Sequence, residues 1–244
     1  MKHALFALLF PATMAMAQAP LPVATYPIPV HVESASSGLF IDLVQAVASA
    51  AQVPIRISVQ PPPRAVQNFS SGNQAVLFPA LDVLFPAGTS IVRSKEAIDC
   101  KEDFVFTRQG TPKLNNLKEL KGLRVGITRG YPYAREVSES KEFTVEAANS
   151  DEANLKKLVA GHIDAFILDE KTGIHALEQS GLSRKVQYDP KHPVSRQEVY
   201  YAFQNTPEGR QLAEKFSNAL AQLKREGRFQ SITRGITFAR GCAR

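Results

Sequence analysis

Two acids stand at matching places in a sequence unit that occurs twice. In each copy a stretch with helical spacing stops at a glycine, and an apolar run that ends in an acid follows. The copies are residues 65–82, with Gly72 and Asp82, and residues 155–169, with Gly161 and Asp169. Such a carboxylate can accept hydrogen bonds from a ligand or from the start of the next helix. Because glycine can take the left-handed conformation that ends a helix, two such units predict two similar α/β lobes.

Groups that commonly support catalysis are scattered. The sequence has no Gly-x-Ser-x-Gly, no paired Cys and His, and no metal-ligand spacing among its four histidines after the first segment, His31, His162, His175 and His192. Glu33 or Glu170 can act as an acid or base, but neither has a recognisable catalytic setting. We therefore expect a protein that is not an enzyme and that holds no metal and no cofactor.

Cys100 and Cys242 are the two cysteines of the chain, separated by 142 positions. In an oxidising compartment they predict one disulfide, with two free thiols as the alternative. The bond would tie the C-terminal tail to the first half of the chain. By the loop-entropy argument it would contribute about 4 to 5 kcal/mol to stability.

The N-terminal segment predicts export. Lys2 precedes an apolar run, residues 4–17, that is too short to span a bilayer. The small residues Ala15 and Ala17 predict cleavage after residue 17, so residues 1–17 are a secretory signal peptide. Cleavage after Ala19 would leave Pro20 first, and an uncleaved anchor is the other alternative.

Composition indicates a folded protein with uneven charge. With 44% hydrophobic and 21% charged residues, the chain can form a substantial core. The net charge is +6, and residues 210–244 hold eight Arg or Lys against Glu214 and Glu226. We interpret this segment as a solvated surface and expect no nucleic-acid partner, because export is predicted and no nucleic-acid-binding motif is present.

The order of elements predicts an α/β fold with a largely parallel sheet. Helical spacing covers residues 39–51, an extended connection is expected at the prolines 61–63, and Thr206-Pro207 begins a last helix that Gly227 ends. Placing this helix on the first lobe makes that lobe discontinuous. The predicted lobes are residues 18–107 with 205–244, and residues 108–204, with crossings near 106–111 and 201–205.

The ordered series of short motifs resembles the bacterial extracellular solute-binding proteins of family 3, which include the periplasmic amino-acid-binding components of ABC importers. The motifs are Gly38-x-x-x-Asp42, Leu117-x-x-Leu-Lys-Gly122-x-x-Val-Gly126, Gly130-Tyr131, Leu158-x-x-Gly161-x-x-Asp164-Ala-x-x-x-Asp169 and Lys224-x-x-Gly227-x-Phe229-x-x-Ile232. The resemblance covers nearly all of residues 18–244 and is strongest over 117–170.

The resemblance implies a two-lobed periplasmic binding protein-like fold whose lobes, joined by two crossover strands, close on a small ligand. The ligand expected from it is an amino acid or a related small carboxylate. The expected partner is an inner-membrane ABC permease or a membrane sensor, and we expect a periplasmic monomer.

The resemblance also implies ligand-binding roles in the second lobe. Asp169 stands where the family places the acid that binds the ligand's ammonium group, and the alternative is a helix N-cap. Gly130 and Tyr131 match a turn at a helix start that binds the ligand's carboxylate through backbone N–H groups, although Pro132 removes one donor.

Three residues of the first lobe are further candidates. Arg93 is the nearest match to the family's carboxylate-binding arginine, although an inserted stretch with Cys100 follows it. Arg64, directly after the prolines, is the second candidate for that role. Tyr26 stands where the family often places an aromatic ring over the ligand, with an ordinary surface tyrosine as the alternative. Asp169→Ala and Arg93→Ala are predicted to weaken binding.

Two other functions remain open. A sensor or interaction protein with the same fold would signal to a membrane partner without transporting solute, and the displaced arginine favours it. The same scaffold also hosts a cyclohexadienyl dehydratase, which needs a positioned acid or base in the cleft.

Overall fold

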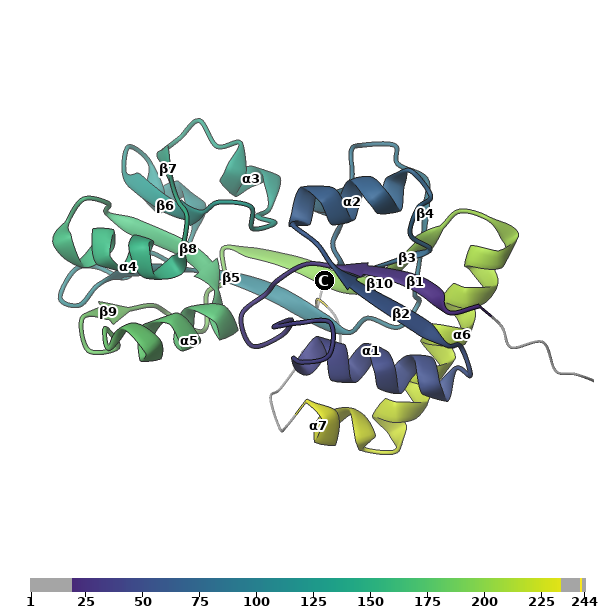
Figure 1. Cartoon of the computed structure of the whole chain (residues 1–244). Coiled ribbons are helices and arrows are strands. Elements are labelled where there is room, and N and C mark those ends of the chain that lie inside the picture. Colours follow the sequence, from purple (N-terminus) through teal and green to yellow (C-terminus); the bar gives the residue numbers. More distant parts are fainter. Residues whose placement is uncertain (1–18, 234–241, 243–244) are drawn as a thin grey trace, which may run out of the picture.

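The structure is a computed structural model that describes residues 19–233 and residue 242; the predicted signal peptide, residues 1–17, lies outside the described residues. Two lobes stand side by side, joined by two long strands, β5 (Asp99–Arg108) and β10 (Ser195–Gln204) (Figure 1). The other strands are β1 (Leu21–Thr25), β2 (Ile55–Val59), β3 (Val76–Ala80), β4 (Ile91–Arg93), β6 (Arg124–Thr128), β7 (Thr144–Ala148), β8 (Ala165–Asp169) and β9 (Val186–Gln187).

The helices are α1 (Leu39–Ala50), α2 (Pro62–Ser70), α3 (Arg135–Ser138), α4 (Asp151–Ala160), α5 (Glu170–Ser180), α6 (Pro207–Arg225) and α7 (Arg228–Ile232), with short 3₁₀ turns η1 (Asp82–Leu84) and η2 (Leu117–Leu120). Pro62 opens α2, so the extended connection predicted at the three prolines is wrong for its last two residues. Proline is tolerated in the first helical turn because the N–H it lacks has no intrahelical partner there. The predicted cap of α6 is confirmed, since Thr206 accepts the N–H of Gly209 at 3.0 Å.

One sheet runs through both lobes in the order β2-β1-β3-β10-β5-β8-β6-β7, with β4 beside β10 and β9 beside β5. The outer pairs β1–β2, β1–β3, β6–β7 and β6–β8 are parallel, as the predicted βαβ series requires. Strands β5 and β10 run antiparallel to each other and to their neighbours. This is the predicted α/β two-lobed arrangement.

Each long strand changes lobe part-way along its length. Residues 99–103 of β5 pair with residues 195–199 of β10; β5 then continues beside β8, and β10 beside β3 and β4. Phe104 and Phe106 pack in the core of the second lobe, whereas Tyr201 and Phe203 pack in that of the first. The predicted boundaries at 107/108 and 204/205 therefore fall several residues after the change of core, and we propose boundaries near residues 103 and 199.

Both copies of the repeated unit contain the predicted helix, glycine and strand, but only the second strand ends in its acid. Gly72 follows α2 with φ +78° and Gly161 follows α4 with φ +78°, so both glycines take the left-handed conformation. Strands β3 and β8 come next. The acids then differ, because Asp169 ends β8, whereas Asp82 lies beyond β3 at the start of η1.

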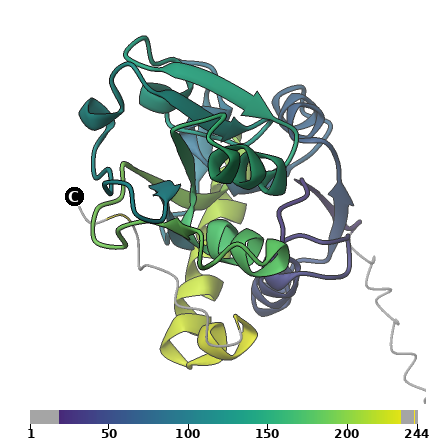
Figure 2. The same ribbon diagram turned by 90° about the vertical axis from the view of Figure 1, so that its left-hand side faces the viewer.

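Alternating side chains along the central strands separate two core layers in each lobe. In β10, Tyr201 and Phe203 face the layer with α1, α6 and α7, whereas Tyr200 and Ala202 face the layer with α2. In β8, the buried residues likewise alternate between a layer with α4 and α5 (Phe166 and Leu168) and a layer with η2 and α3 (Ala165 and Ile167). Figure 2 shows this second lobe facing the viewer.

Helix α5 approaches β5 closely at Gly173. A Cβ atom there would lie 2.5 Å from Cζ of Phe106, whose side chain is fully buried. We expect Gly173→Ala to lower the free energy of unfolding by about 1 to 3 kcal/mol, because overpacking outweighs the gain in helix propensity. Urea unfolding measures this, with the exposed Glu178→Ala on the same helix as the control. A variant Gly173→Ala as stable as the wild type would contradict the packing.

Candidate ligand-binding site

A cavity of about 470 Å³ lies between the two lobes. The first lobe lines it with the segments after β1 and β2 and after β3, the second lobe with the turn after β6 and the start of α5, and β5 and β10 form its base. This volume is within the range of small-molecule sites. The lining residues are Tyr26, Pro27, Ile28, His31, Phe40, Val59, Gln60, Pro61, Pro62, Pro79, Leu81, Asp99, Lys101, Arg129, Gly130, Tyr131, Pro132, Asp169, Thr172 and Val199.

Most of the wall that the first lobe provides is apolar. Tyr26 is buried, with 2% of its surface exposed, and its hydroxyl donates a hydrogen bond to the Pro79 carbonyl at 2.9 Å. The alternative of a surface tyrosine is therefore wrong, and burial raises the pKa of the Tyr26 hydroxyl far above its ordinary value. Because this hydroxyl is occupied, Tyr26 presents an apolar ring to the cavity.

Asp169 lines the cavity and also caps α5. Its Oδ1 accepts hydrogen bonds from the backbone N–H and from the hydroxyl of Thr172, both at 3.1 Å. No hydrogen bond from the described part of the chain reaches Oδ2. The cap and the ligand role predicted for this residue are therefore compatible, since each oxygen can serve one of them.

The turn at Gly130 and Tyr131 also lines the cavity, but it isn't at a helix start. The N–H of Tyr131 donates to the Thr128 carbonyl, and α3 begins only at Arg135. Pro132 lacks an N–H, as expected, and the N–H of Tyr131 is already used within the turn, so the backbone here offers fewer donors than predicted. The Tyr131 hydroxyl donates to Asp151 at 3.0 Å, and burial, followed by the Asp151 charge, raises the pKa of that hydroxyl.

The two predicted arginines of the first lobe do not line the cavity. Arg93, at the end of β4, pairs with Asp82 at 2.8 Å and lies over the ring of Tyr200, 4.8 Å from its centroid. Tyr200 also donates to Asp82 at 2.7 Å. The acid of the first repeat thus holds Arg93 away from the cavity. Arg64 lies exposed on α2.

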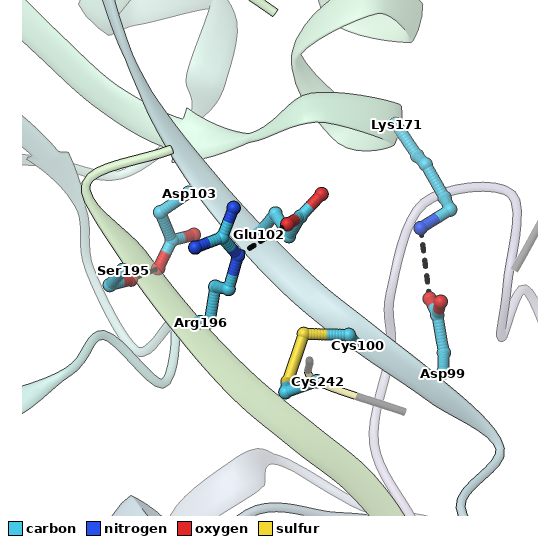
Figure 3. Close-up of a disulfide and its surroundings, with 8 residues drawn as sticks. All are labelled: Asp99, Cys100, Glu102, Asp103, Lys171, Ser195, Arg196 and Cys242. Atoms are coloured by element: carbon cyan, nitrogen blue, oxygen red, sulfur yellow. Dashed lines mark hydrogen bonds and ion pairs between the residues drawn. A yellow bond between two sulfur atoms is a disulfide. The ribbon is translucent and has the colours of Figure 1, made fainter. Parts of the chain in front are cut away.

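Sequence reasoning missed several charged residues of the cavity. Asp99 on β5 pairs with Lys171 of α5 at 2.9 Å (Figure 3), and Lys101 pairs with the fully buried Asp103. Burial opposes the charge of Lys171, but the nearby carboxylates of Asp99 and Asp169 outweigh it and raise the pKa of the ammonium group. The signal that could have found Asp99 and Lys101 is their alternation along the strand on either side of Cys100.

Arg129 is a further residue of the cavity that was not singled out. It is exposed, and its Nε donates to Oδ1 of Asn149 at 3.1 Å. No carboxylate of residues 19–233 forms an ion pair with its guanidinium group. Its place directly before Gly130, inside a turn that the family resemblance had identified, is the signal that could have found it.

Comparison with known proteins shows the same architecture. No family model matches the sequence. The ligand-binding core of GluR0 from Nostoc punctiforme, in complex with L-glutamate, superposes with a TM-score of 0.70 at 21% identity, covering 87% of this chain and 97% of that one. The fold is that of the periplasmic binding proteins.

Other proteins with this binding-protein fold have different roles. A histidine kinase sensor domain matches with a TM-score of 0.70 at 18% identity, covering 90% of this chain and 96% of that one. The arginine-, lysine-, histidine-binding protein ArtJ from Geobacillus stearothermophilus matches with a TM-score of 0.67 at 19% identity, over 88% and 93% of the two chains.

One curated relative matches in sequence. The probable amino-acid-binding protein YxeM of Bacillus subtilis (strain 168) is 23% identical over 150 residues, which make up 60% of this chain and 50% of that protein. The chain thus matches about half the length of this relative. The match agrees with the resemblance to solute-binding proteins that the motifs indicated.

His31 lies where the first lobe of the binding-protein fold approaches α5. Its ring packs edge-on against Phe40, with centroids 4.6 Å apart, and Nδ1 is 3.0 Å from the Pro29 carbonyl. Burial lowers the pKa of His31, although the Pro29 carbonyl and the charges of Asp169 and Asp99 partly oppose this. His31 is therefore neutral at pH 7.

The burial of neutral His31 predicts a loss of stability in acid. The unfolded chain takes up a proton near the ordinary pKa of 6.5, whereas the folded protein resists it, so unfolding becomes easier as the pH falls below that value. Between pH 7.5 and 5.5 we expect wild type to lose more unfolding free energy than His31→Gln. Urea unfolding of both proteins at the two pH values measures this difference. Equal losses would show that His31 does not contribute.

The predicted disulfide is confirmed. Cys100 and Cys242 are bonded, with Cα atoms 4.9 Å apart (Figure 3). Cys100 lies on β5 between the cavity residues Asp99 and Lys101, so it faces the opposite side of the strand. The bond thus joins residue 242 to the strand that forms the base of the cavity.

No group of three or more His, Cys, Asp or Glu side chains in residues 19–233 and 242 is arranged to hold a metal ion. In that part of the chain no helix has the length and apolar character needed to cross a membrane.

Proposed function

We propose that this protein is a periplasmic solute-binding protein that encloses an amino acid or a related small carboxylate between its two lobes. The observation that carries the proposal is the cavity itself, which both lobes and both crossover strands line. Asp169 supplies a carboxylate for the ligand's ammonium group, and apolar side chains of the first lobe cover the rest of the ligand. The lobes close on the ligand by bending within β5 and β10.

The proposed setting is export and delivery to a membrane partner. The predicted signal peptide supports a periplasmic location, a compartment in which a disulfide such as Cys100–Cys242 persists. The protein acts as a monomer and presents the loaded, closed form to an inner-membrane ABC importer. The names of YxeM, a probable amino-acid-binding protein, and of ArtJ, an arginine-, lysine-, histidine-binding protein, support this reading.

A sensor is the second candidate, and the likeness to a histidine kinase sensor domain favours it. Such a protein would use the same closure to signal to a membrane partner. Both candidates require a ligand in the cavity, so the first experiment is common to them.

A thermal-shift screen of residues 18–244 tests the proposal. The panel contains the twenty amino acids, small carboxylates and small amines, each at about 1 mM, which is roughly 100 times a Kd of about 10 μM. At that excess a ligand of the folded state adds about 2.7 kcal/mol and raises the melting temperature by several degrees. No shift with any amino acid or carboxylate would reject the proposed ligand class.

A further inference from the structure

The charges that line the cavity fall into two groups. Asp99 is paired with Lys171, and Lys101 with Asp103, so these two lining charges are already neutralised within the protein. Asp169 and Arg129 differ, because neither forms an ion pair with any residue of the described chain. The cavity therefore offers a ligand one carboxylate and one guanidinium group.

Arg129 has the geometry to bind a carboxylate. Its hydrogen bond to Asn149 uses Nε, and within residues 19–233 neither terminal nitrogen donates a hydrogen bond. Two terminal N–H groups of a guanidinium can bind both oxygens of one carboxylate. Arg93, by contrast, pairs with Asp82 through its terminal nitrogen Nη2 and does not line the cavity.

The remaining wall selects the ligand's side chain. Rings and aliphatic groups make up most of it, with Tyr26, Phe40 and Tyr131 as the aromatic members and prolines from both lobes between them. A charged ligand side chain would find no unpaired partner there and would lose its hydration, which is costly. At about 470 Å³ the cavity also has room for more than a glycine or an alanine.

We propose that the ligand is an α-amino acid with a large apolar or aromatic side chain, and that Arg129 of the second lobe binds its carboxylate in place of Arg93. This inference rests on the proposed function. Asp169 then binds the ammonium group, and the apolar wall of the first lobe covers the side chain. Both ligand-binding charges belong to the second lobe, so the first lobe contributes mainly by excluding water from the ligand's side chain.

Calorimetric titration with matched ligands tests the side-chain preference. The ligands are L-phenylalanine and L-leucine, against L-arginine, L-lysine and L-glutamate. We expect the first two to bind at least about tenfold more tightly than the other three. Tighter binding of a charged amino acid would overturn the inference and leave the proposed function standing. Failure of every amino acid to bind would overturn the inference, and failure of the small carboxylates of the thermal-shift screen as well would reject the proposed function itself.

Two arginine variants and one truncated ligand test the role of Arg129. We expect Arg129→Gln to weaken the binding of L-phenylalanine about 10- to 100-fold. Arg93→Gln is the matched control and should leave this affinity unchanged. Phenethylamine lacks the carboxylate, so its affinity should be the same in wild type and Arg129→Gln. An equal loss for both ligands, or a loss in Arg93→Gln alone, would overturn the role of Arg129. Because Arg129 is exposed, its replacement should leave the melting temperature of the free protein unchanged.

Discussion

Asp169→Asn is expected to weaken ligand binding about 100-fold or more while the protein remains folded. The carboxylate is the one acid of the cavity that forms no ion pair in the described chain, and Asn removes its charge while keeping its shape. Truncating or neutralising one partner of an enclosed charged pair commonly costs 2 to 5 kcal/mol, which is a factor of roughly 30 to several thousand. Calorimetric titration of wild type and Asp169→Asn, with a ligand identified in the thermal-shift screen, gives the change in Kd.

The choice of Asn separates binding from helix capping. Asn and Asp are about equally good N-caps, so Asp169→Asn should keep the hydrogen bonds to Thr172 and the stability of α5. Asp169→Ala should also lose about 1 kcal/mol of stability, because the cap disappears. Asp189→Asn, at a carboxylate outside the cavity, is the matched control and should bind normally. Unchanged affinity in Asp169→Asn would refute the assignment of the ammonium site.

Removal of the disulfide is expected to have the largest effect on stability. The bond between Cys100 and Cys242 closes a loop across 142 positions, so the double variant with Ser at both positions should lose about 4 to 5 kcal/mol of unfolding free energy. This is a large part of the total stability of an ordinary domain. Urea unfolding of the oxidised wild type and the double variant measures the loss.

A control separates loss of the bond from loss of packing. Cys100 is buried, so Ser at position 100 also buries a hydroxyl group. Cys242→Ser alone lacks the bond but keeps Cys100, so its difference from oxidised wild type gives the loss of the bond, and its difference from the double variant gives the effect of Ser at position 100. A loss below about 1 kcal/mol on reduction would show that the closed loop is not what stabilises the fold.

Most of the fold could be predicted, because short sequence patterns indicate where its helices and strands begin and end. Gly72 and Gly161 end their helices in the same left-handed conformation, and the apolar runs after them become β3 and β8. The cap at Thr206 and the disulfide could likewise be predicted, from a threonine before a proline and from the two cysteines of the chain. These features depend on the periodicity of the sequence, on backbone conformation or on the pairing of two cysteines, and none needs knowledge of distant side chains.

The site was less predictable, because whether a charged side chain is available to a ligand depends on which ion-pair partner it meets in the folded protein. Whether Arg93 reaches the cavity depends on Asp82, which a different element brings beside it. Whether Asp99 is available depends in the same way on Lys171 of α5, whereas Lys101 pairs with Asp103 of its own strand. Asp169 was easier to identify, because it ends a strand whose pattern was clear.

The change of core within β10 also sets the order in which the protein can fold during synthesis. The sheet of the first lobe gains its central strand only from residues 200–204, and its helical layer needs Phe216 and Leu220 of α6. The N-terminal strands therefore leave the ribosome long before their partner exists. The second lobe is nearly continuous and can pack first. A nascent chain that stops before β10 thus leaves β1 to β3 with an open edge that other chains can join.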